Sequence, residues 1–214
     1  MKLNVQQLLK SWKDNIPDFD EKMEVFAKNQ VEYIDNLSNI ASAFSAFAKM
    51  PGTNPLEVDL LEQIRTTLEL FRNADNITFD VNWPLEKNVF IYADKEHLNG
   101  IFSNLLKNSI QAIPPERKGL IKVGVRIERN KVTVSVSDNG IGIPESLKKK
   151  MFTPNFTTKS SGAGLGLSIV RKYTEGANGR IWFESEPGRG TIFFVEFPLI
   201  YTVENPGEPF KDKR

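Results

Sequence analysis

Two asparagines, Asn104 and Asn108, are spaced four residues apart in a stretch whose apolar residues recur at helical spacing. Side chains four positions apart share one face of a helix. Their amide carbonyl oxygens are the kind of ligand that a hard cation such as Mg²⁺ accepts. The spacing therefore predicts a magnesium site, although an isolated pair of this kind also occurs on an ordinary solvated helix face.

A carboxylate, Asp138, follows an apolar strand pattern and opens the segment Asp138-Asn139-Gly140-Ile141-Gly142. At the end of a strand, it can accept a hydrogen bond from an exocyclic amine such as that of adenine. The two glycines allow the backbone to pass close to a flat ligand. The segment predicts a base-binding pocket, but by itself it is also a good turn.

A glycine-rich loop, Gly162-Ala163-Gly164-Leu165-Gly166, opens a predicted helix over 167–174. Backbone N–H groups at the start of a helix, together with the helix dipole, suit a polyphosphate. The loop is not a dinucleotide fingerprint, because it follows a long irregular stretch and not a strand. It also lacks the Gly-Lys-Ser/Thr ending of a P-loop, so by itself it is a weak indication.

The elements around these clusters are typical of a mixed α and β domain. Asp94 is expected to cap the helix that carries the asparagines, and the breaker cluster 50–55 marks the start of the domain. The order of elements favours an α+β protein, a two-layer α/β sandwich with a mixed sheet. Helices are predicted over 60–71, 94–113 and 167–174, and strands over 77–81, 89–92, 120–128, 131–137, 180–184 and 191–197.

The first 50 residues read as an α-helical hairpin, broken at 15–18. An almost unbroken heptad seam predicts pairing in a coiled coil or bundle, and hence a homodimer. A free-standing two-helix decoration is the alternative. The seam consists of Met23, Phe26, Gln30, Tyr33, Leu37, Ile40, Phe44 and Phe47. The predicted organisation is a hairpin over 1–50, a linker over 51–55, an α/β domain over 56–198 and a mobile tail over 199–214.

Composition narrows the function classes. The chain has 28 Lys and Arg against 27 Asp and Glu, so its net charge of +1 gives no electrostatic case for binding nucleic acid. It has no cysteine, which excludes disulfides and thiolate metal sites. No apolar run approaches the roughly 20 residues of a membrane helix, and no signal-peptide core follows Met1. We therefore expect a cytoplasmic fragment without direct membrane contact.

In this order, the three clusters resemble the N, G1 and G2 boxes of the GHKL ATPase superfamily, and specifically those of nitrogen-regulation-type sensor histidine kinases. Residues 151–159 resemble the F box, and 188–191 resemble the last glycine turn. The resemblance covers residues 20–198. It implies a Bergerat (GHKL) fold, ATP and Mg²⁺ as cofactors, transfer of a phosphoryl group to a histidine, and a response regulator receiver domain as partner.

The resemblance also implies roles for individual residues. Asp138 would bind the adenine amine, Thr191 would lie near the base, and Asn108 would coordinate Mg²⁺ with assistance from Asn104. Lys107 would neutralise phosphate charge. Further nucleotide contacts would come from Ala112, Gly140, Gly142, Ile143, Thr158, Lys159, Gly162, Gly164, Leu165, Gly166 and Leu167. Family members that hydrolyse ATP carry a general-base glutamate at the position of Asn104, so the asparagine favours a kinase.

The phosphoacceptor histidine of such kinases has no counterpart here. The only histidine is His97, which is expected to be a surface or structural residue of the asparagine-bearing helix. We expect the acceptor upstream of Met1, in a parent protein anchored in a membrane. The chain itself should bind Mg-ATP without phosphorylating itself, and its dimerisation should be weakened. The alternatives are an anti-sigma-type serine kinase and a nucleotide-gated interaction module.

Overall fold

The structure, a computed structural model, describes residues 12, 19–31, 34, 53–83, 87–157 and 164–204. The chain divides into two units, the larger of which consists of Met50–Phe156 and Gly164–Arg214. In the smaller unit, residues 19–31 form a helix. Of the predicted seam, Phe26 and Gln30 are half-buried there, whereas Met23 is exposed. The other seam residues lie outside the described residues.

The strands with alternating apolar residues form a five-stranded sheet in the order β2-β4-β5-β7-β6. β2 runs parallel to β4, whereas the other neighbouring pairs are antiparallel. The predicted mixed sheet is therefore confirmed. Its strands are β2 (Ile77–Asn82), β4 (Gly119–Glu128), β5 (Lys131–Asp138), β6 (Arg180–Glu186) and β7 (Gly190–Pro198).

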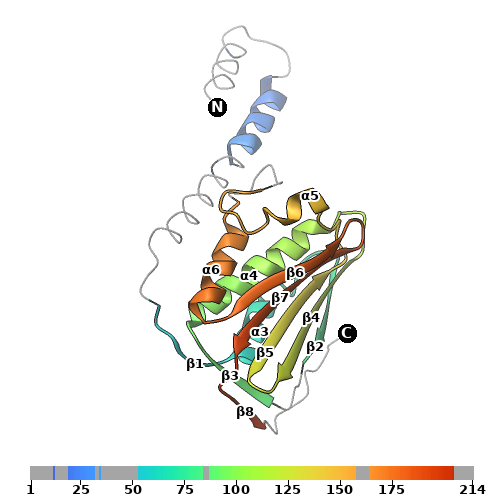
Figure 1. The fold of residues 1–214 in the computed structure, drawn as a ribbon. Coiled ribbons are helices and arrows are strands. Elements are labelled where there is room, and N and C mark those ends of the chain that lie inside the picture. Colours follow the sequence, from blue (N-terminus) through green and yellow to red (C-terminus); the bar gives the residue numbers. More distant parts are fainter. Residues whose placement is uncertain are drawn as a thin grey trace. The chain divides into compact units, whose positions relative to one another are not determined.

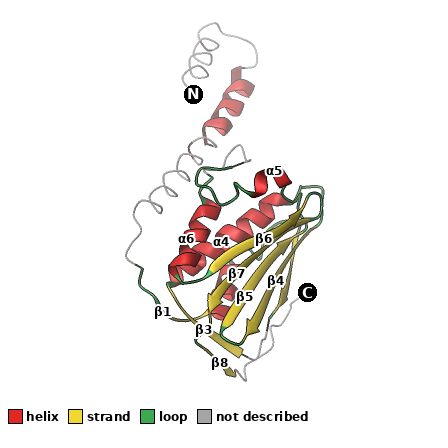
Figure 2. Ribbon diagram, in the orientation of Figure 1, coloured by secondary structure: helices red, strands yellow, loops and turns green. Residues whose placement is uncertain are grey.

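Two helices, α4 (Lys95–Ala112) and α6 (Gly166–Gly176), pack side by side on one face of this sheet (Figure 1). A third helix, α3 (Leu60–Glu69), packs against α4. Every second residue of β5 and β7 points into the layer between sheet and helices, as a strand period of two requires. These buried side chains include Val132, Val134, Val136, Phe193, Val195 and Phe197. The predicted two-layer sandwich is confirmed (Figure 2).

The start of α4 follows the predicted capping pattern. Asp94 has an extended backbone, and its Oδ1 accepts hydrogen bonds from the N–H groups of Glu96 at 2.8 Å and His97 at 3.3 Å. These bonds satisfy two of the donors that the first helical turn leaves unpaired. Burial opposes the charged form, but the backbone donors prevail and hold the pKa of Asp94 below its usual value.

A second, three-stranded sheet, ordered β1-β3-β8, was not predicted. It consists of β1 (Leu56–Asp59), β3 (Lys87–Ala93) and β8 (Tyr201–Glu204). The prediction of a mobile tail was wrong for 201–204, because this segment pairs with β3 and Tyr201 stacks on Phe90 at 4.8 Å. The Tyr201 hydroxyl also donates to Glu57 across the sheet at 3.0 Å. Residues after Glu204 lie outside the described ranges.

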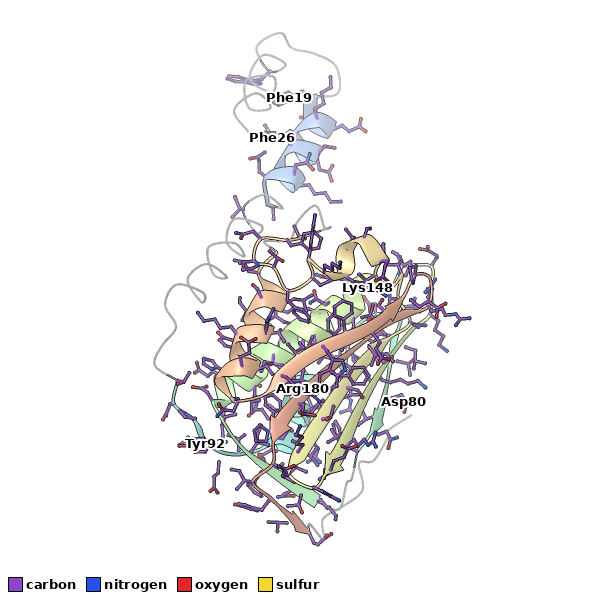
Figure 3. The ribbon with its side chains drawn as sticks, in the orientation of Figure 1. Phe19, Phe26, Asp80, Tyr92, Lys148 and Arg180 are labelled. Atoms are coloured by element: carbon purple, nitrogen blue, oxygen red, sulfur yellow. The ribbon has the colours of Figure 1, made fainter. Side chains whose placement is uncertain are left out.

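In the described part of the stretch that was predicted to be irregular between β5 and α6, residues Glu145–Lys148 form a short helix, α5. Lys148, labelled in Figure 3, pairs with Glu145 at 2.7 Å. In the part of the chain that the structure describes, no helix has both the length and the apolar character needed to span a membrane.

Candidate functional site

Asp138 occupies the last position of β5 and continues the inward-facing series of Val134 and Val136. Only 6% of its surface is exposed. Its Oδ1 accepts a hydrogen bond from the N–H of Gly140 at 2.8 Å. The period of the strand thus carries a carboxylate to the helix-covered side of the sheet, at the edge where the loop begins.

Burial raises the pKa of the Asp138 carboxyl above its usual value, because desolvation outweighs the opposing groups. Those groups are the backbone N–H of Gly140, the backbone N–H of Thr191 and the hydroxyl of Ser109 on α4. Ser109 Oγ is itself buried and makes no hydrogen bond of ordinary geometry with the protein. A buried acceptor and a buried hydroxyl therefore lie together between β5 and α4.

The loop after Asp138 is fastened to its surroundings by its own polar groups. Asn139 Oδ1 accepts from the N–H of Leu120 at 2.9 Å, and its Nδ2 donates to the carbonyl of Lys118 at 2.9 Å. The N–H of Ile141 donates to the carbonyl of Ala112 at 2.9 Å. A Cβ at Gly140 would lie 2.5 Å from that same carbonyl oxygen. The loop therefore lies directly on the C-terminal end of α4.

Two positions near this loop, 142 and 190, have a backbone conformation and close neighbours that only glycine fits. Gly142 has φ +69° and Gly190 has φ +120°, in the region that favours glycine. A Cβ at Gly142 would overlap the carbonyl oxygen of Glu186, and one at Gly190 would overlap that of Asp138. The predicted last glycine turn therefore packs its backbone against the end of β5.

Thr191 and Ile143 are joined to this region through Ser185. Thr191 is buried, with 4% of its surface exposed, and its hydroxyl lies 2.9 Å from Ser185 Oγ. Ser185 Oγ also accepts from the N–H of Ile143 at 2.8 Å. The structure thus brings Asp138, Gly140, Gly142, Ile143 and Thr191 together, with Ala112 beneath them.

The two asparagines lie one turn apart on α4, and both are half-buried. Asn104 Nδ2 donates to the carbonyl of Gly100 at 2.7 Å. Its Oδ1 faces the start of α6, where a Cβ at Gly166 would lie 2.9 Å from it. Lys107 is exposed on the same stretch of helix. The structure therefore joins the asparagine cluster to the glycine-rich loop.

The glycine-rich loop leads into α6 at Leu165, which is the N-cap residue of that helix. The side chain of Leu165 has no polar atom and makes no capping hydrogen bond. Leu165 is buried, Leu167 is half-buried, and Gly164 lies against the backbone of Asn155 and Phe156. Thr158, Lys159 and Gly162 lie outside the described residues.

Arg117 is a residue of the site that could not be predicted from the sequence. Its guanidinium donates to the carbonyl oxygens of Asn139, Gly140 at 2.8 Å and Gly188 at 3.4 Å. It therefore holds the loop after β5 to the last glycine turn. No sequence signal identifies it, because its partners are backbone carbonyls of two distant loops.

Comparison with known families identifies this architecture. A family model described as "Histidine kinase-, DNA gyrase B-, and HSP90-like ATPase" matches residues 93–200, half of the chain. The chain belongs to this ATPase family. The matched range runs from the end of β3 to just beyond β7, so it contains every described site residue named above.

Relatives of this ATPase-family chain include proteins named as sporulation kinases and as sensor histidine kinases. Sporulation kinase C of Bacillus subtilis is 31% identical over 141 residues, which are 66% of this chain and 32% of that protein. The sensor histidine kinase ZraS of Klebsiella oxytoca is 34% identical over 171 residues, 77% of this chain and 36% of that protein. The chain spans less than half the length of these curated relatives, between 22% and 43% of each.

Solved structures agree with these relatives. The catalytic domain of histidine kinase ThkA is 38% identical and has a TM-score of 0.61; the match covers 68% of this chain and 95% of that one. NtrY-like sensor histidine kinases of Rickettsia are also similar, with 29% identity over 91% of this chain for Rickettsia typhi. The sequence relatives confirm the predicted resemblance to sensor histidine kinases. The family model and the solved catalytic domain confirm the predicted GHKL-type fold.

Proposed function

We propose that this chain is the ATP-binding catalytic portion of a sensor histidine kinase, which transfers the γ-phosphoryl group of ATP to a histidine side chain. One observation carries the proposal: a single helix, α4, joins both halves of the site. Near Asn104 it meets the start of α6, and near Ser109 and Ala112 it meets the Asp138 loop. Eight residues of helix separate Asn104 from Ala112, about 12 Å, a span suited to an extended nucleotide.

The base-binding end fits adenine chemically. Asp138 has a buried carboxylate with acceptor capacity left over after its bond to Gly140, and the buried Ser109 hydroxyl lies beside it. A carboxylate and a hydroxyl together can accept from and donate to the amine and ring nitrogen of a purine. Gly142 and Gly190 pack closely against neighbouring backbone, and Thr191 is buried next to Gly190. We assign these residues to the surroundings of the base, as the family pattern implies.

The other end fits a metal-bound triphosphate. Asn104 and Asn108 offer amide oxygens, the hard ligands that Mg²⁺ takes, and Asn104 Oδ1 already faces Gly166. When bound, Mg²⁺ neutralises part of the triphosphate charge. Backbone N–H groups from Gly164 to Leu167 would receive the phosphates. Lys107 would add positive charge, and we assign Thr158, Lys159 and Gly162 to the nucleotide as the family pattern implies.

In phosphoryl transfer, these residues would mainly position the triphosphate and stabilise its charge. The bond between the γ-phosphorus and the oxygen bridging to the β-phosphate breaks, and a bond from phosphorus to an imidazole nitrogen forms. ADP leaves with the bridging oxygen. An imidazole attacks through its own lone pair, so this transfer needs no general base at position 104, whereas attack by water would benefit from one. An asparagine there suits a kinase.

The partners follow from the same proposal. The acceptor histidine would lie on a helical hairpin, which in this family pairs two protomers, and the phosphoryl group would pass on to a receiver domain. Histidine kinase ThkA has been solved in complex with response regulator protein TrrA. That structure is 30% identical with a TM-score of 0.70, over 92% of this chain and 56% of that one. ATP is a cytoplasmic substrate, so we propose a cytoplasmic location.

Phosphoryl transfer in trans tests the proposal. The chain is incubated with Mg²⁺, γ-labelled ATP and a separate helical hairpin that bears a phosphoacceptor histidine. We expect acid-labile label on the hairpin and none on the chain itself. Labelling of the hairpin should be much slower when Asp138→Asn replaces the wild type. Nucleotide binding without labelling of the hairpin would instead indicate a nucleotide-gated interaction module. Labelling of a serine in an added protein would indicate a serine kinase.

A further inference from the structure

At the contact between helices α4 and α6, the ring of a tyrosine fills the space beside a glycine. Tyr173 of α6 stacks on His97 of α4, with ring centroids 4.0 Å apart and an interplanar angle of 9°. A Cβ at Gly100 would lie 2.9 Å from Tyr173 Cε2 and 3.3 Å from Cδ2. The ring is therefore held against two successive turns of α4, and its contact with Gly100 leaves no room for a larger residue.

Gly100 is also the residue that orients Asn104. Its carbonyl accepts the hydrogen bond from Asn104 Nδ2 at 2.7 Å, so the amide oxygen points the other way, toward Gly166. One side of Gly100 thus contacts Tyr173, while its carbonyl fixes the amide of Asn104. Asn104 belongs to α4 and Gly166 belongs to α6. A shift of the Tyr173 ring that moves one helix relative to the other therefore changes the distance between Asn104 Oδ1 and Gly166.

His97 lies in the first turn of α4, which hydrogen bonds hold in place through Asp94. The His97 N–H donates to Asp94 Oδ1 at 3.3 Å, and Asp94 Oδ2 accepts from the N–H of Asn54, just before β1, at 3.0 Å. His97 is buried, with 8% of its surface exposed, which excludes the surface role considered for it from the sequence. The tyrosine ring therefore packs against a turn of α4 that is fixed at its start.

We propose that Tyr173 is a positioning residue for the phosphate end of the site. By filling the space beside Gly100 and stacking on His97, it sets the spacing of α4 and α6 and thereby aims the Asn104 amide oxygen at the start of α6. The ring, and not the hydroxyl, performs this role. The consequence for nucleotide binding rests on the proposed function, because it requires that Asn104 assist the metal-bound triphosphate.

Substitutions at the contact separate positioning from simple loss of packing. Tyr173→Ala removes the ring, and Tyr173→Phe keeps it. Gly100→Ala adds one methyl group against the ring, and alanine is a better helix former than glycine, so this variant should remain folded. Tyr92→Ala is the matched control, because Tyr92 is an exposed tyrosine of β3, 57% exposed and labelled in Figure 3.

Two readouts are measured on each variant. The first is the NMR resonance and hydrogen-exchange rate of the Asn104 side-chain amide without nucleotide. The second is the ratio of affinities for a non-hydrolysable ATP analogue with Mg²⁺ and with EDTA, by calorimetry. We expect Tyr173→Ala and Gly100→Ala to shift and deprotect the Asn104 amide. Both should also reduce the Mg²⁺-dependent gain in affinity about tenfold, the usual effect of losing support behind a metal ligand.

The remaining variants complete the test. Tyr173→Phe and Tyr92→Ala should match the wild type in both readouts. Adding Gly100→Ala to Tyr173→Ala should cause no further loss, because the ring that the methyl group displaces is absent. An Asn104 amide that is identical in the wild type, Tyr173→Ala and Gly100→Ala would overturn the positioning role whether or not nucleotide binds. A wild-type chain that binds no nucleotide would instead overturn the proposed function, while the amide resonance still decides the role of Tyr173.

Discussion

The backbone of Gly190 lies against the carbonyl oxygen of Asp138, so closely that a Cβ at position 190 would overlap that oxygen. The neighbouring Thr191 is the register partner of Asp138 in the β5–β7 ladder. The end of β5, which carries Asp138, and the last glycine turn therefore form one packed unit. A change that moves the turn must also move the end of β5.

Alanine at position 190 should be far more damaging than alanine at position 188. Gly188 has φ +82° and Gly190 has φ +120°, but only Gly190 has atoms within 4 Å of an added Cβ. We expect Gly190→Ala to lower the free energy of unfolding by about 2–4 kcal/mol through strain and overlap, and Gly188→Ala by about 1 kcal/mol through strain alone. Urea denaturation of both variants measures this difference, and equal losses would refute the close packing.

Replacing Asp138 by asparagine should remove most ATP binding while preserving the fold. An asparagine can still accept from the Gly140 N–H, but it loses the charged acceptor and presents an NH₂ group to the ligand amine. A hydrogen bond to a charged group contributes about 1.5–3 kcal/mol, so affinity should fall roughly 10- to 100-fold. Asp80→Asn on β2, an exposed carboxylate labelled in Figure 3, is the control that should bind ATP normally. Unchanged affinity in Asp138→Asn would remove the adenine assignment.

The raised pKa of Asp138 predicts how the free energy of unfolding of the wild type differs from that of Asp138→Asn as the pH changes. Because burial favours the protonated acid in the folded state, its contribution to stability is complete below the ordinary carboxyl pKa of 3.8. This contribution is lost as the pH rises through the higher folded value. The free energy of unfolding of the wild type should therefore fall relative to Asp138→Asn between acidic and neutral pH. A difference that stays constant or changes in the opposite direction would contradict the raised pKa.

Arg117 should matter for the order of the site and not only for global stability. Its guanidinium reaches three carbonyl oxygens on two loops, and Arg117→Ala leaves them without that donor. We expect a loss of about 1–3 kcal/mol in stability and faster amide hydrogen exchange at Asn139–Gly142. Arg126→Ala on β4, an exposed arginine paired with Glu128, should have little effect on either quantity. If amide hydrogen exchange at Asn139–Gly142 is equally slow in Arg117→Ala and Arg126→Ala, Arg117 does not hold this loop in place.

Local signals in the sequence accounted for the framework of the domain. Asp94 could be identified as a helix cap because its capping bonds, to Glu96 and His97, reach only two and three residues along the chain. Asp138 could be identified because strand period alone carries it to the side of Val134 and Val136. In both cases the physical cause lies within one element.

Features that depend on distant pairing were missed. The burial of His97 depends on Tyr173, and the strand at 201–204 depends on the stacking of Tyr201 on Phe90. Arg117 acts on backbone carbonyls, which carry no residue-specific signal. The direction of the Asn104 amide is set by Gly100 and Gly166, which belong to two helices. Side-chain types predicted the chemistry, but only tertiary contacts determine the geometry.

A crystal structure of the chain with Mg²⁺ and a non-hydrolysable ATP analogue tests nucleotide binding most directly. We expect the adenine amine within hydrogen-bond distance of the Asp138 carboxylate, and the metal-bound phosphates between Asn104 and the start of α6. A nucleotide bound elsewhere, or bound here with Asp138 contacting only protein groups, would contradict the assignment of the site.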